Sequence, residues 1–273
     1  AYTTATPTGR DSSPPTPADA VGETEFYAWD SMLAAKKIAS TDITYAIPRR
    51  NWANATTYDM YKHNISSSST ATSGASNLYD STFYFITSAY RVYKVLDNNS
   101  GTAYSGAEPT SESTSPFELG GYVLKYMYSI TASEAAKYLT TDYAPVSNDS
   151  TITAAATDGK IESLVVTAGS GYTNGTYYAA VFGDGSSQGT SSGAIVRLTV
   201  SGGSIASFGL TSGTDTTIQS GGSGYTFGTV NLGSTFTFSD STLSTASSIG
   251  SGTGGAVEVI ISPKGGHGND AIA

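Results

Sequence analysis

Two histidines and the absence of cysteine limit the chemistry that this 273-residue chain can perform. His63 and His267 have no acidic neighbours at the spacing of a metal-ligand set. Without cysteine the chain has neither a disulfide framework nor a thiolate metal site. We therefore expect no metal ion and no cofactor.

Three glycine-rich triplets have the composition of ligand-binding loops. Gly169-Ser170-Gly171 and Gly222-Ser223-Gly224 are each followed by a β-type run, whereas a phosphate loop leads into a helix N-terminus. Gly183-Asp184-Gly185 stands alone, without the recurring aspartates of calcium-binding repeats. We interpret all three as structural turns.

Serines and carboxylates are the remaining candidates for catalysis. Serine is abundant, but no Gly-x-Ser-x-Gly elbow stands between a strand and a helix. Glu112, Glu118 and Asp142 are candidate surface carboxylates, and the spatial pairing that glycoside hydrolysis needs is not visible in a sequence. The prediction is that the protein is not an enzyme. A hydrolase is the alternative that one serine or carboxylate substitution would test.

The composition bears on partners. The net charge is −9, and nucleic-acid binding requires clustered Lys and Arg, so we expect no nucleic-acid partner. No run reaches the length of a membrane span, so we expect no direct membrane insertion. Charged residues make up 13% of the chain, against roughly 25% in ordinary soluble domains. Gly, Ser and Thr take their place, which is typical of β-rich viral and extracellular surface proteins.

The stretch from Tyr79 to Tyr128 holds two aromatic runs around a polar loop, 97–115. Tyr and Phe favour strands, and apolar residues on both faces of the first run predict that neither face is solvated. We expect one continuous strand through Tyr90 and Tyr93 to Val95. In the second run, 121–130, Tyr122, Leu124, Tyr126 and Tyr128 are predicted to share one face. These runs predict the central sheet of a mainly β (α+β) fold with an aromatic-rich antiparallel β-sandwich core.

Two helices are expected at the periphery of this core. The first, 23–38, is amphipathic, with Trp29 on its apolar side, and it either packs on the core or docks a partner. The second, 131–141, has Thr131 or Ser133 as its N-cap. Between the first helix and the aromatic runs we expect a short strand, 43–47, and a second one near Tyr58 and Tyr61. Trp52 is expected to pack against the first helix rather than to stack on bases or sugars.

An internal repeat begins near residue 150. Each copy consists of a strand, a GSGYT turn, a short strand, a Gly/Ser-rich loop and a long alternating strand; the long strands lie in 191–200 and 252–262. We expect the glycines to supply positive φ and the tyrosine to anchor each turn. The second copy is longer by polar inserts at 211–220 and 234–249. The predicted organisation is therefore a flexible arm (1–22), an aromatic core (23–148), a glycine-rich repeated all-β module (149–262) and a segment that returns to the core (263–273).

Several motifs of the aromatic core resemble the baseplate wedge protein of contractile-tailed bacteriophages. They are Ala28-Trp29-Asp30, Trp52, Tyr58-Asp59-Met60-Tyr61, the strand Tyr90–Asn99, the strand Gly121–Ile130 and the tail SPKGGHGNDAIA. They occur in the order of that family and cover 24–147 and the last dozen residues. The repeat region is not part of this resemblance.

The resemblance implies a structural role in the virion tail baseplate, and in the host cytoplasm during assembly. It implies that the chain links neighbouring wedge subunits around the hub, as a homodimer and with other wedge and hub proteins, and relays rearrangement when the sheath contracts. The candidate subunit-interface residues are Trp29, Trp52, Tyr58, Tyr61, Tyr90 and Tyr93. The alternative is a glycan- or receptor-binding tail module that acts through the repeat region.

Overall fold

The computed structural model describes residues 26–27, 29–34, 36–185, 193–233 and 249–272. The chain divides into two compact units, 1–44 and 45–273. The predicted arm, 1–22, and most of the predicted insert at 234–249 lie outside the described residues. The four-segment organisation inferred from the sequence stays a prediction, and each of the two units is described by itself.

The first unit does not contain the long helix predicted over 23–38. Its described residues are helical at 26–27 and 29–30, and none of the described residues from 31 to 39 is helical. A short 3₁₀ turn, η1 (Ser40–Asp42), follows. Phe26, Trp29 and Leu33 are 80%, 66% and 103% exposed. Isolated helices shorter than about 12–15 residues are marginal in water, which is a physical reason for the described residues not to continue the predicted helix.

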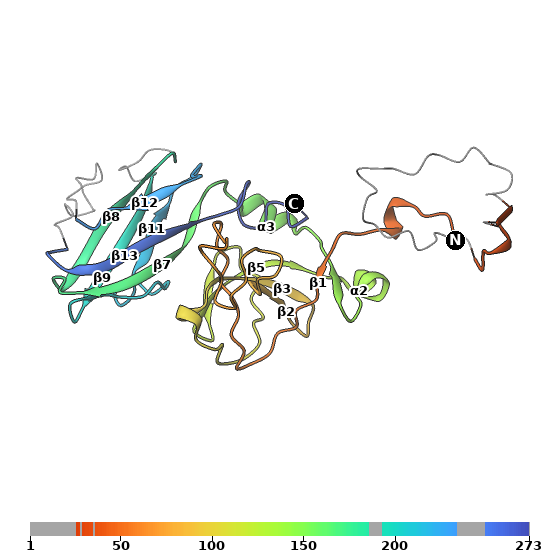
Figure 1. The fold of residues 1–273 in the computed structure, drawn as a ribbon, viewed down its shortest axis with the longest axis horizontal. Helices are drawn as coiled ribbons and strands as arrows, with labels where there is room; N and C mark the ends of the chain where they lie inside the picture. The colour runs from red at the N-terminus through yellow and green to blue at the C-terminus, as the bar shows by residue number, and fades with distance from the viewer. Residues whose placement is uncertain (1–25, 28, 35, 186–192, 234–248, 273) are drawn as a thin grey trace. The chain divides into compact units, whose positions relative to one another are not determined.

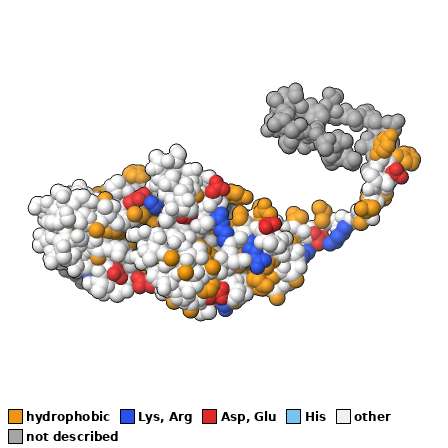
Figure 2. All heavy atoms as spheres, turned by 60° about the horizontal axis from the view of Figure 1, so that its bottom comes forward, with side chains coloured by type: hydrophobic (Ala, Val, Ile, Leu, Met, Phe, Trp, Pro, Cys, Tyr) orange, Lys and Arg blue, Asp and Glu red, His pale blue; other side chains and the backbone are white. Residues whose placement is uncertain are grey.

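The second unit is mainly β with antiparallel sheets, as predicted. Its aromatic sheet has the strand order β2-β3-β5-β4, formed by β2 (Tyr84–Ile86), β3 (Arg91–Asp97), β5 (Tyr122–Ser129) and β4 (Phe117–Leu119). A two-stranded sheet pairs β1 (Ala46–Pro48) with β6 (Tyr143–Pro145). The strand predicted over 43–47 is therefore displaced toward Pro48, and no strand forms at the Tyr58–Tyr61 segment. On the face drawn in Figure 2, this unit's surface is mostly white, which marks backbone and uncharged polar side chains, as the low charged content leads one to expect.

The first aromatic run is a hairpin rather than one continuous strand. The chain turns between Thr87 and Arg91, where the Tyr90 N–H donates to the Thr87 carbonyl (3.0 Å) and Tyr90 has a φ of 61°. β2 therefore pairs antiparallel with β3. Both faces of this hairpin are buried, as the apolar residues on both sides had predicted.

A β-bulge changes the face that Tyr128 occupies. Val92 pairs with Tyr128 and Tyr93 with Tyr126, so Met127 is the extra residue on β5. Tyr122, Leu124 and Tyr126 share a core cluster with Tyr93, as predicted. Tyr128 instead lies with Val92 in a different cluster. The expectation that it shares the face of Tyr126 was wrong, because a bulge shifts the alternation by one residue.

Two short helices flank these sheets (Figure 1). The helix α2 (Ala132–Tyr138) begins at Thr131, whose hydroxyl accepts from the Glu134 N–H, while the Glu134 carboxylate accepts from the Thr131 N–H. This capping box confirms the predicted second helix. The helix α3 (Ser150–Ala155) was not predicted, and the Asp149 carboxylate caps it.

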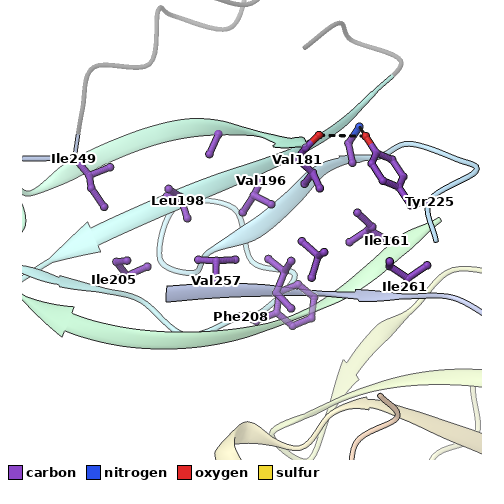
Figure 3. Close-up of a cluster of buried hydrophobic side chains, with 14 of the residues drawn as sticks. Ile161, Val181, Val196, Leu198, Ile205, Phe208, Tyr225, Ile249, Val257 and Ile261 are labelled. Atoms are coloured by element: carbon purple, nitrogen blue, oxygen red, sulfur yellow. Dashed lines mark hydrogen bonds between the residues drawn. The ribbon is translucent and has the colours of Figure 1, made fainter. Parts of the chain in front are cut away.

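The repeat region forms a second set of strands around a hydrophobic core (Figures 1 and 3). The side chains labelled in Figure 3, among them Leu198, Val257 and Phe208, lie between its strands. One sheet pairs β13 with β7, and the other has the order β10-β9-β8-β12, with β11 paired to β9. The strands are β7 (Ile161–Ser170), β8 (Gly175–Gly183), β9 (Ala194–Ser201), β10 (Ser204–Ile205), β11 (Thr217–Gly221), β12 (Gly228–Val230) and β13 (Thr253–Ile261).

The two copies of the repeat are interlocked. The first strand of copy one, β7, pairs with the last strand of copy two, β13, and β11 of copy two pairs with β9 of copy one. The GSGYT turns also connect the two copies. The tyrosine hydroxyl of each turn accepts a hydrogen bond from a backbone N–H on the long strand of the other copy. The predicted role of these tyrosines as anchors is confirmed. Part of the predicted polar insert at 211–220 belongs to β11, where Thr217 is buried against β9.

The aromatic sheet and the repeat strands share buried contacts within this unit. Leu96 and Val123 of the aromatic sheet belong to the core cluster of the repeat strands, and Ile260 of β13 belongs to the cluster that contains Tyr93. The Ser163 hydroxyl on β7 donates to the carbonyl of Leu96. This junction places β7 beside the lysines of β3 and β5.

Candidate functional site

The six residues predicted to form subunit interfaces occupy different environments. Tyr58, Tyr61 and Tyr93 are buried in the chain's own aromatic core. Trp29 is exposed, and Tyr90 is 38% exposed at the tip of the β2–β3 hairpin. The structure therefore does not bring the six together on one surface.

Trp52 lies against the aromatic core of the second unit. Its ring meets Tyr104 edge-on, with a centroid distance of 5.9 Å. Tyr104 comes from the loop 97–115 and is fully buried, so this loop contributes a large core side chain that its polar composition did not predict. The expected packing of Trp52 on the 23–38 helix was wrong, since that helix is not formed.

A group of buried charged residues lies where β3 and β5 approach β7. Lys94 and Lys125 are cross-strand partners in the aromatic sheet, and both are buried. The Glu162 carboxylate on β7 accepts from Lys125 Nζ at 3.3 Å and from Lys160 Nζ at 3.2 Å. Glu162 thus pairs with two lysines, and the buried side chain of Lys94 lies close enough for the Glu162 charge to act on it.

Among the three lysines of this group, Lys94 is the one without a carboxylate partner in the described residues. No carboxylate in the described part of the chain lies within 4.0 Å of its Nζ, which sits 3.6 Å from the centre of the Tyr61 ring. Burial lowers the pKa of Lys94 to about 7, with Glu162 acting in the opposite direction. A buried ammonium on an aromatic face is stabilised by the ring, though less than by an ion pair.

His267 is buried beside the same tyrosine. Its ring meets Tyr61 edge-on at a centroid distance of 5.1 Å. Neither ring nitrogen has a hydrogen-bond partner among the described residues. Burial, together with the positive charges of Lys94 and its neighbours, holds the pKa of His267 well below its ordinary value. His267 is therefore neutral, and its place in the cluster is that of a packing aromatic ring.

A groove of about 510 Å³ opens beside Lys94. One side is formed by the aromatic sheet and the β1–β6 region, and the other by the tail of the chain. Its walls are mainly apolar, and charged side chains enter it at only three positions, which are Lys94, Lys264 and Asp270. The lining residues are Ile47, Tyr61, Leu78, Phe83, Tyr84, Val92, Lys94, Met127, Tyr128, Val146, Pro263, Lys264, Gly266, Gly268, Asp270 and Ala271.

A second hollow, of about 390 Å³, lies between the β4–β5 hairpin and the β10–β11 connection. Asp97, Glu118 and Asp215 line it. The Glu118 carboxylate is occupied, since it accepts from the Leu210 N–H and from the Thr211 hydroxyl. Within the described ranges no group of three His, Cys, Asp or Glu side chains is arranged to hold a metal ion. The hydrogen bonds of Glu118 join the β4–β5 hairpin to the β10–β11 connection at this hollow.

The residues that the sequence singled out for chemistry have structural contacts. His63 Nδ1 accepts from the Ile261 N–H at 3.2 Å, and Glu112 pairs with Arg91 at 2.5 Å. The groove and its lysine were missed. The sequence did hold one indication of the groove, which is the position of Lys94 in a run predicted to be buried on both faces. A lysine on such a strand must contact a charged partner, an aromatic ring or a cavity.

Of the helices that the structure describes, none is both long and apolar enough to cross a membrane. No family model matches the chain, and neither the curated proteins nor the solved structures contain a significant match to it.

Proposed function

We propose that this chain is a structural subunit of a phage tail baseplate that links neighbouring wedge subunits around the hub and relays their rearrangement on sheath contraction. Its partners are other wedge and hub proteins and a second copy of itself, and its place is the virion, after assembly in the host cytoplasm. The observation that carries the proposal is the set of linked motifs in 24–147. These motifs resemble those of the wedge family and stand in the same order.

The packing of those motifs supports the proposal. The Tyr58–Tyr61 motif crosses the Gly121–Ile130 motif, where the Tyr122 hydroxyl accepts from the Tyr58 N–H at 3.1 Å and the two rings meet edge-on. Asp59 of the same motif accepts from the Ser73 and Thr82 backbone N–H groups. These two motifs thus pack into one aromatic core, which suits a subunit that transmits force through its contacts.

Surface features of the described residues supply contact sites for such a subunit. The groove beside Lys94 is one, and the exposed side chains of Trp29 and Tyr90 are others. Aromatic side chains of this kind are frequent anchors of protein interfaces.

A density map of purified contractile tails that contain this chain tests the proposal. We expect the chain in the ring around the tail hub, in contact with wedge proteins in both extended and contracted tails. Antibody labelling of the same particles provides an independent location. Tails assembled without this chain that keep an intact baseplate would overturn the proposal.

A glycan-binding role for the repeat region is the second candidate. Phe182 on β8 and Phe227 before β12 are 37% and 59% exposed. Phe182 lies opposite Thr229, which follows Phe227 by two residues, and an exposed aromatic ring offers an apolar face on which a sugar stacks. A glycan array probed with the full chain and with Phe227→Ala tests it. Binding that Phe227→Ala abolishes would favour this candidate, and an array without signal would remove it.

A further inference from the structure

The buried ammonium of Lys94 is the starting point. It lines the groove and has no carboxylate partner among the described residues. Its Nζ lies 3.6 Å from the centre of the Tyr61 ring and 5.6 Å from the centre of the Phe83 ring. Neighbouring Lys125 and Lys160 share the carboxylate of Glu162. A buried charge is normally paired or hydrogen-bonded, because desolvating it without a partner is unfavourable.

The walls of the groove define the rest of the ligand chemistry. Phe83, Tyr84, Tyr128 and Val92 present apolar surface, with Met127 as an adaptable side chain beside them. Lys264 is a second positive charge in the lining, against Asp270 as the one carboxylate. The groove therefore combines a large apolar surface with an excess of positive charge, and a volume of about 510 Å³ accommodates several side chains.

We propose that this groove is the docking site for a segment of a neighbouring protein subunit in which an aspartate or glutamate stands between large apolar residues. The carboxylate of the segment pairs with Lys94, and the flanking apolar side chains cover Tyr84, Tyr128 and Val92. Charge complementarity carries the choice of occupant, because the segment supplies the counter-ion that Lys94 lacks. The choice of a protein segment over a small carboxylate rests on the proposed function as an assembly subunit.

Docking is expected to depend on pH in one direction. In the free protein the pKa of Lys94 is about 7, and a carboxylate beside it raises that value. Binding therefore takes up a proton above pH 7, so the affinity falls by up to about tenfold per pH unit as the pH rises from 7 to 9. The groups around Lys94 are Tyr61, Lys125 on β5, Glu162 on β7 and, on the tail, Lys264, His267 and Asp270.

Short capped peptides and the full-length chain test the proposal. One peptide set places a central aspartate between every pairing of Phe, Trp, Tyr, Leu and Met, and the matched set replaces the aspartate by asparagine. We expect several aspartate peptides to bind at least about tenfold more tightly than their asparagine counterparts at pH 6.5. Lys94→Met removes this preference, and Lys137→Met, on α2 outside the groove, keeps it.

A second variant tests the proposal even if Lys94→Met does not fold. Leu78 lines the groove and is 36% exposed, so Leu78→Asp does not disturb the core. The added carboxylate has the same charge as the central aspartate of the peptides and repels it. It is expected to weaken the aspartate peptides and to leave the melting temperature unchanged. Equal affinity for both peptide sets, or a preference that survives Lys94→Met, overturns the proposal. Binding of octanoate with no binding of any peptide also overturns it, in favour of a small-molecule site.

These measurements use the isolated chain and do not require a particle. A negative peptide result therefore overturns the docking proposal alone, and the density map still tests the baseplate assignment. A density map that excludes the chain from the baseplate leaves the peptide preference as a property of the groove.

Discussion

The hydroxyl of Tyr225 accepts a hydrogen bond from the backbone N–H of Ala194 at 3.1 Å, and this bond joins the turn of one repeat to the long strand of the other. Tyr172 has the equivalent bond to the Gly255 N–H at 3.0 Å. Figure 3 shows the Tyr225 hydroxyl directed at the start of β9, with a second interaction to the Val181 carbonyl. The two copies are therefore held by a reciprocal pair of tyrosine bonds.

Removing one of these hydroxyls is expected to destabilise the second unit. Tyr225→Phe leaves a buried N–H without its side-chain acceptor, which costs about 1–3 kcal/mol. Tyr177→Phe is the control, because its hydroxyl donates to the Thr173 carbonyl in an exposed position. Urea unfolding measures both. Equal effects of the two substitutions would show that the bond to Ala194 adds nothing specific.

Alanine substitutions at two glycines of the same turn distinguish the cost of backbone strain from the cost of a steric clash. Gly222 has a φ of +57°, and an added Cβ would lie 2.8 Å from the Ala194 nitrogen. Gly224 has a φ of +73° with nothing within 4 Å. We expect Gly222→Ala to cost about 3 kcal/mol and Gly224→Ala about 1 kcal/mol. Thermal unfolding of the pair provides the test, and a larger loss for Gly224→Ala would contradict the described packing of the turn.

Lys94→Met is expected to stabilise the protein at neutral pH. The pKa of Lys94 is about 7 in the folded chain, against about 10.4 when unfolded, so between these values the unfolded chain binds more protons. The stability of the wild type therefore rises with pH from 7 toward 10 through this residue. We expect the variant to gain about 2 kcal/mol at pH 7 and to lose that pH dependence.

Denaturant unfolding at several pH values between 7 and 9.5 measures this effect, with Lys137→Met as the control. Above pH 10 the buried tyrosines act in the opposite direction, since burial raises the pKa of Tyr61 to about 12. Parallel pH profiles for Lys94→Met and the wild type would mean that Lys94 is not desolvated in the folded chain.

Asp59 is expected to be the most sensitive carboxylate of the aromatic core. Burial alone raises its pKa, but hydrogen bonds from Ser73 and Thr82 outweigh it and hold that pKa below the ordinary value. Asp59→Asn turns an acceptor into a donor that faces other donors and is expected to cost about 3 kcal/mol. The wild type loses this contribution as the pH falls below 4, because the carboxylate becomes protonated.

The matched control is Asp80→Asn, whose carboxylate lies at the surface and accepts from the Asn77 side chain. We expect it to change the free energy of unfolding by less than about 0.5 kcal/mol. If both substitutions have the same small effect at pH 7, the network around Asp59 does not stabilise the fold.

Trp29→Ala is expected to leave the melting temperature unchanged and to reduce association. Trp29 is two-thirds exposed, so its truncation removes little buried surface. Trp52→Ala is the control, because Trp52 packs on Tyr104 and its loss is expected to cost about 2–3 kcal/mol. Differential scanning calorimetry and sedimentation velocity on the full chain measure the two effects. A clear drop in melting temperature for Trp29→Ala would place this side chain in a core.

The sequence determined the features that depend on local pattern. Aromatic and β-branched runs predicted a mainly β chain, the GSGYT turns predicted a repeat with tyrosine anchors, and Thr131 with Glu134 predicted the capped helix α2. Each of these depends on residues that are neighbours in the chain, where propensity and hydrogen-bonding geometry act directly.

Only the tertiary structure decided which strands pair and which charges meet. The two repeats have the same local pattern, so nothing local tells the turn at Tyr172 to bond to β13 rather than to β9. The bulge at Met127 moved Tyr128 to another face, and the described residues from 31 to 39 do not continue the helix predicted over 23–38. The groove beside Lys94 arises where a strand, a tail and a loop converge. Such contacts join residues distant in sequence, and their energies exceed the local preferences.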